Sequence, residues 1–131
     1  MTRFKLTIEY DGLPYAGWQR QKEVVSVQEV IEQSLAQFIP EKPILTVAGR
    51  TDAGVHATGQ VAHFDVHEKV LDPAVIESAT NHYLKNKKVA ILKVEQVDDT
   101  FHARFSARRR SYIYRIVNRR AALTFEEGCA W

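Results

Sequence analysis

Cysteine is almost absent from this 131-residue chain, because Cys129 is the only one. A single thiol excludes an intrachain disulfide and a zinc site built on several cysteines. No apolar run approaches the length of a membrane span, and no apolar signal region precedes the strand-like residues that begin at Arg3. We therefore expect a cytoplasmic protein that is not held together by disulfides.

Two common kinds of cofactor site are also missing from the sequence. Gly49, Gly54 and Gly59 are not followed by the Gly-Lys-Ser or Gly-Lys-Thr that completes a nucleotide-triphosphate loop. Four histidines could be grouped with Asp52 as metal ligands, but they lack the compact spacing of known motifs. These histidines are His56, His63, His67 and His102. We expect neither a metal nor a cofactor.

Acidic residues are missing from residues 101–120, which hold seven arginines out of the 18 basic residues of the chain. Such a local excess of positive charge is typical of a surface that binds a polyanion, and nearby tyrosines add faces on which bases can stack. A solvated strand edge is the alternative. We favour a nucleic-acid partner. The candidate contact residues are His102, Arg104, Arg108, Arg109 and Arg110.

The order of predicted elements indicates a single domain. Residues 3–10 alternate between apolar and polar side chains, which is the period of a strand with one buried face. One helix is predicted from a capping box at Ser26 to the stop at Pro40, and a second begins at Asp72. The other predicted strands are residues 44–48, 60–66, 89–97 and 111–117, with a short extended segment at 101–107. This β-α-β-β-α-β order predicts a ferredoxin-like α+β fold, a mainly antiparallel sheet with helices on one face.

The densest cluster of functional side chains lies in residues 49–57, which read Gly-Arg-Thr-Asp-Ala-Gly-Val-His-Ala. If residues 47–52 are extended, Arg50 and Asp52 project to the same side, and the guanidinium favours the ionised carboxylate. Asp52 would then be a nucleophile or a base, beside glycines that let the chain turn sharply. An ordinary surface ion pair is the alternative interpretation.

These nine residues resemble the signature of the TruA family of tRNA pseudouridine synthases, and the similarity covers nearly the whole chain. Further similar segments are residues 10–12, 15–21, 26–28, 59–64, 101–107 and 112–114. The resemblance implies that Asp52 is the catalytic residue and that Tyr112 packs against a flipped uracil. Arg50 would hold the carboxylate or occupy the space that the base leaves. It also implies a ferredoxin-like fold, no cofactor, and uridines of the tRNA anticodon arm as substrate.

Family members are longer and carry a second, similar domain that forms the opposite wall of the catalytic cleft. By this resemblance, residues 1–131 correspond to the N-terminal domain, the C-terminal domain is absent, and the isolated fragment is expected to be inactive. The full-length enzyme is expected to be a homodimer. A noncatalytic RNA-binding module of ferredoxin-like fold is the alternative, although such a module gains nothing from a carboxylate that faces a polyanion.

Overall fold

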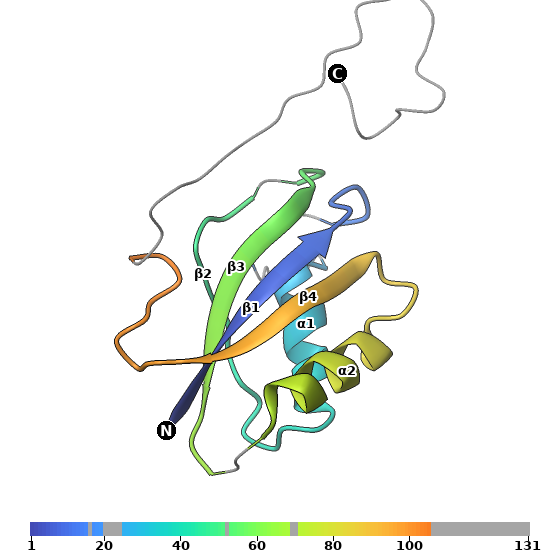
Figure 1. The fold of residues 1–131 in the computed structure, drawn as a ribbon. Coiled ribbons are helices and arrows are strands. Elements are labelled where there is room, and N and C mark those ends of the chain that lie inside the picture. Colours follow the sequence, from blue (N-terminus) through green and yellow to red (C-terminus); the bar gives the residue numbers. More distant parts are fainter. Residues whose placement is uncertain (16, 20–24, 52, 69–70, 106–131) are drawn as a thin grey trace, which may run out of the picture.

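The computed structural model describes residues 1–15, 17–19, 25–51, 53–68 and 71–105, and Figure 1 shows their arrangement. In this part of the chain four strands and two helices follow the predicted order. They are β1 (Thr2–Tyr10), α1 (Val27–Ala36), β2 (Thr46–Val47), β3 (Ala57–Val66), α2 (Pro73–Tyr83) and β4 (Val89–Val97). The strand predicted at residues 111–117 lies outside the described residues.

The four strands form one sheet in the order β2-β3-β1-β4, and every neighbouring pair is antiparallel. Both helices lie on the same face of this sheet (Figure 1). The strand order and the one-sided helices confirm the predicted ferredoxin-like α+β fold. Among the described residues, no helix is long and apolar enough to span a bilayer.

The core lies between the sheet and the two helices. Phe4, Leu6 and Ile8 of β1 are fully buried, as the alternation in the sequence predicts. The helices begin where expected, because the Ser26 hydroxyl accepts a hydrogen bond from Glu29 N and the Asp72 carboxylate accepts one from Ala74 N. These two caps fix the direction in which each helix leaves its loop. The remaining core residues include Val27, Ile31, Leu35, Phe64, Val66 and Ile76.

The other face of the sheet is covered in part by the segment that follows β4. Arg3 on β1 donates hydrogen bonds to the carbonyl oxygens of Asp99, at 2.9 Å, and Phe101, at 2.6 Å. The same guanidinium pairs with both carboxylate oxygens of Asp65 on β3, at 2.8 and 3.0 Å. One arginine therefore fastens residues 99–101 to two neighbouring strands.

Three predicted boundaries were wrong, and a contact with a distant residue accounts for the first of them. β2 covers two residues rather than 44–48, since the Glu32 carboxylate of α1 takes the Leu45 N–H at 2.9 Å. α1 ends at Ala36 instead of continuing to Pro40, and a turn follows it. β3 begins at Ala57, three residues before the predicted start.

Candidate active site

The loop between β2 and β3 contains the signature residues 49–57. The chain bends at Ala48 and Gly49, so the described part of residues 47–52 is not the continuous extended segment considered in the sequence analysis. The Gln60 side-chain amide donates to the Gly49 carbonyl oxygen at 2.6 Å, while Ala48 N donates to the Val61 carbonyl oxygen at 2.8 Å. The Gln60 side chain therefore binds the Gly49 carbonyl oxygen in place of a backbone N–H of β3, and the chain leaves the sheet at this point.

The loop is held on both sides of Asp52, which itself lies outside the described residues. On one side, the Thr51 carbonyl accepts a hydrogen bond from Trp18 N at 3.0 Å, and the Thr51 hydroxyl lies 2.7 Å from the Tyr10 hydroxyl. On the other side, Gly54 N donates to the Tyr15 carbonyl at 3.3 Å. Gly54 has φ +77°, a left-handed conformation that favours glycine, so the sharp turn expected there is confirmed.

A second loop, which follows β1, packs directly against the signature loop. Gly12 N donates to His56 Nδ1 at 2.9 Å, and a Cβ added to Gly12 would lie 1.9 Å from the Val55 carbonyl oxygen. The two backbones approach each other so closely that no side chain fits between them. Gly12 and His56 are 44 residues apart in the sequence, and their contact joins the two loops into one unit.

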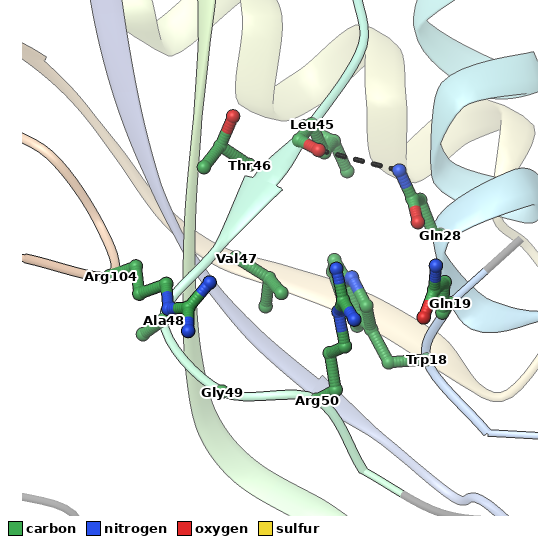
Figure 2. Close-up of a pocket in the computed structure, with 10 residues that line it drawn as sticks. All are labelled: Trp18, Gln19, Gln28, Leu45, Thr46, Val47, Ala48, Gly49, Arg50 and Arg104. Atoms are coloured by element: carbon green, nitrogen blue, oxygen red, sulfur yellow. Dashed lines mark hydrogen bonds between the residues drawn. The ribbon is translucent and has the colours of Figure 1, made fainter.

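A cavity of about 590 Å³ opens beside the signature loop, between α1 and the edge strand β2 (Figure 2). Arg50 enters it from the loop, and Arg104 enters it from the segment after β4. None of its described lining residues is acidic. Trp18 is buried in its wall, and the indole Nε1 has no hydrogen-bond partner among the described residues. The other lining residues are Gln19, Gln28 and residues 45–49.

The sequence-predicted site residues are only partly brought together in the described part of the chain. Arg50 and Arg104 line the same cavity. His102 is two residues before Arg104 but is not among the residues that line the cavity. It packs against His63, with 4.8 Å between the two ring centroids. Residues 103–105 form a turn, so the described part of the predicted extended stretch at residues 101–107 is not a strand. His102 Nδ1 accepts hydrogen bonds from the backbone N–H of residues 104 and 105 in this turn. Asp52, Arg108, Arg109, Arg110 and Tyr112 lie outside the described residues.

His63 on β3 fixes this turn to the sheet, a role that sequence reasoning missed. Its Nδ1 accepts a hydrogen bond from Ala103 N at 3.0 Å, and the residue is 4% exposed. Burial, helped by the nearby Arg3 and His102, lowers the pKa of His63 to about 4. The neutral ring therefore serves as an acceptor near pH 7 and holds the segment that presents Arg104. The sequence offered one signal for this role, because His63 is a polar residue of β3 on the face of the sheet opposite the core.

Comparison with known proteins agrees with this geometry. A family model described as tRNA pseudouridine synthase matches residues 6–106, which include both motifs that meet at Gly12 and the whole signature loop. The chain belongs to this family. The resemblance inferred from the motifs is thereby confirmed.

Several curated family members align with the chain from end to end or nearly so. The protein named tRNA pseudouridine synthase A of Methylocella silvestris is 56% identical over 131 residues, which are 100% of this chain and 52% of the relative. The proteins of the same name from Anaplasma phagocytophilum and Parvibaculum lavamentivorans are 53% and 52% identical, over 98% and 100% of this chain and 53% of each relative. The chain thus spans about half the length of these relatives.

Proposed function

We propose that this chain is the N-terminal, catalytic-Asp domain of an isomerase that converts uridine to pseudouridine in tRNA. The proposal rests above all on the family match over residues 6–106, which contain the complete signature. The hydrogen bonds of Thr51 and Gly54 support it, because they hold the backbone on both sides of Asp52. A fixed backbone limits the positions that a reacting carboxylate can take, and such positioning is a large part of catalysis.

The reaction breaks the N1–C1′ glycosidic bond, turns the uracil, and joins C5 to C1′, after which C5 loses its proton. Asp52 either attacks C1′, forming an ester that breaks when C5 bonds to C1′, or removes a proton from the sugar to give a glycal and returns that proton when C5 bonds to C1′. In both routes N1 takes up a proton as C5 loses one, and a carboxylate suits both routes. In this proposal Arg50 keeps the carboxylate ionised or fills the space of the extruded base, and Tyr112 packs against the flipped uracil. Extruding the base costs a few kcal/mol, which stacking and backbone contacts offset.

The same proposal assigns the RNA contacts to the basic residues that follow β4. They are His102, Arg104, Arg108, Arg109 and Arg110. Arg50 and Arg104 line one cavity, whose described lining residues include no acidic side chain. We propose the anticodon arm of tRNA as the substrate region, a homodimer as the working assembly, and the cytoplasm as the location. A second half, comparable to that of the curated relatives, would complete the cleft.

The test is tritium release from C5-labelled tRNA by the protein that joins this chain to such a second half. Asp52→Asn should lower turnover by about 1000-fold or more while tRNA affinity changes little, since the swap keeps the shape and removes the reacting carboxylate. Asp99→Asn is the matched control, because Asp99 is exposed and contacts Arg3 through its backbone carbonyl. Appreciable turnover in Asp52→Asn would remove this residue from the catalytic role. RNA binding without turnover in the parent protein would favour the noncatalytic module.

A further inference from the structure

Phe105 has the largest exposed fraction among the exposed large apolar side chains of the described residues, at 79%. Scattered apolar side chains on a surface are common and need no special role. The surroundings of Phe105 are what set it apart. Its ring is stacked on the ring of His102, with 4.3 Å between the centroids and 29° between the planes. His102 therefore covers part of the ring, and the 79% exposure means that most of the Phe105 side chain still meets solvent.

The support under Phe105 continues down to the sheet. The His102 ring packs edge-on against His63, which is buried on β3. His102 Nδ1 also lies 3.3 Å from both Arg104 N and Phe105 N, so it accepts hydrogen bonds from the turn that carries the phenyl ring. The three rings form a column from the sheet to the surface. An aromatic ring that is already ordered loses little conformational freedom when a second flat group stacks on it.

Positive charge lies close to the exposed Phe105 ring. The Arg104 guanidinium carbon lies over the Phe105 ring, 5.9 Å from its centre, which is farther than the 4.3 Å between the Phe105 and His102 ring centroids. The Arg104 side chain also lines the cavity that contains Arg50. Figure 2 shows Arg104 extending into that cavity from the side opposite α1. An aromatic face next to a cation matches a nucleotide, in which a flat base and a phosphate are joined through a sugar. An apolar peptide would gain little from the arginines.

We propose that Phe105, supported by His102, stacks on an unpaired nucleobase of bound RNA whose phosphate lies towards Arg104. The inference rests on the proposed function in taking RNA as the ligand, and it adds a base-stacking position outside the signature loop. Stacking on an aromatic side chain tolerates any base, so the position would contribute affinity rather than sequence preference.

The experiment measures binding of the 131-residue chain to two fluorescent oligomers of equal length at one salt concentration. One is an oligouridylate, and the other has the same sugar-phosphate backbone without bases. The variants are Phe105→Ala, Phe105→Trp and the control Leu92→Ala, which truncates an exposed apolar side chain on β4. Phe105→Ala should weaken oligouridylate binding by roughly 5- to 100-fold. Binding of the abasic oligomer should change little, and Phe105→Trp should retain the parent affinity for oligouridylate.

Several results would overturn the inference. They are an unchanged affinity in Phe105→Ala, an equal loss for both oligomers, or no oligouridylate binding by the parent chain. A melting temperature clearly lower for Phe105→Ala than for Leu92→Ala would also overturn it, because the ring would then be buried by more of the chain than His102 and would not be accessible to a base. Failure here is distinguishable from failure of the proposed function. Pseudouridine formation that depends on Asp52, with normal binding by Phe105→Ala, would reject the stacking position alone.

Discussion

Protonation of His63 should loosen the segment that presents Arg104, and the stability of the chain should therefore fall between pH 7 and pH 5. The neutral His63 ring is almost fully buried and accepts a hydrogen bond from Ala103 N at 3.0 Å. A proton on Nδ1 removes that acceptor and places a buried positive charge near Arg3 and His102. Among the described charged groups near His63, only Asp65 raises its pKa, and the Asp65 carboxylate is already paired with Arg3.

The magnitude follows from the pKa of His63 in the folded and unfolded chains. Its ordinary pKa is 6.5 and its folded pKa is about 4, so between these values the unfolded chain binds more protons than the folded one. The stability from this residue is complete above pH 6.5 and is lost progressively as the pH falls to 4, for a total of about 3 kcal/mol. About 2 kcal/mol of it should be gone at pH 5. The hydrogen bond with Arg3 lowers the pKa of Asp65 below its ordinary 3.8, so its contribution is lost at more acidic pH.

Urea denaturation at a series of pH values from 7 to 5 measures this loss directly. His63→Asn keeps an oxygen acceptor for Ala103 N and removes the titrating ring, so its free energy of unfolding should vary less with pH than that of the parent by about 2 kcal/mol. His82→Asn is the matched control, because His82 lies on the exposed side of α2. Equal pH dependence in His63→Asn and the parent would show that His63 does not cause the acid sensitivity and would assign it to other groups.

Two further substitutions test how the signature loop is held. Gly12→Ala should destabilise the chain by about 2 kcal/mol or more in urea denaturation, because the new Cβ meets the Val55 carbonyl oxygen at 1.9 Å. Gly59→Ala has open space around its Cβ and serves as the control, so equal stability of the two variants would contradict the close packing of the loops. Tyr10→Phe should cost about 1 kcal/mol, because it deletes the hydroxyl contact with Thr51. In the active protein it should lower kcat more than it raises KM, and a change confined to KM would argue against a positioning role for this contact.

Elements with local signals could be predicted from the amino-acid sequence. The alternation in β1 matches its buried face, and Ser26 and Asp72 cap the helices as predicted. Such signals act between residues a few positions apart, so they are present before any tertiary contact forms. The family resemblance was also readable, since the signature is one continuous stretch of chain. It identified Arg50, which lines the basic cavity.

Tertiary structure alone decided where the chain departs from these local signals. β2 is short because Glu32, 13 residues away, binds Leu45 N, and the signature loop bends where Gln60 takes the Gly49 carbonyl. The sequence also did not predict that Arg50 and Arg104 line one cavity, or that the rings of His63, His102 and Phe105 pack on one another. These contacts depend on the strand order and on the path of the segment after β4. Local propensity carries no information about either, because both are set by which surfaces of distant segments become neighbours when the core is buried.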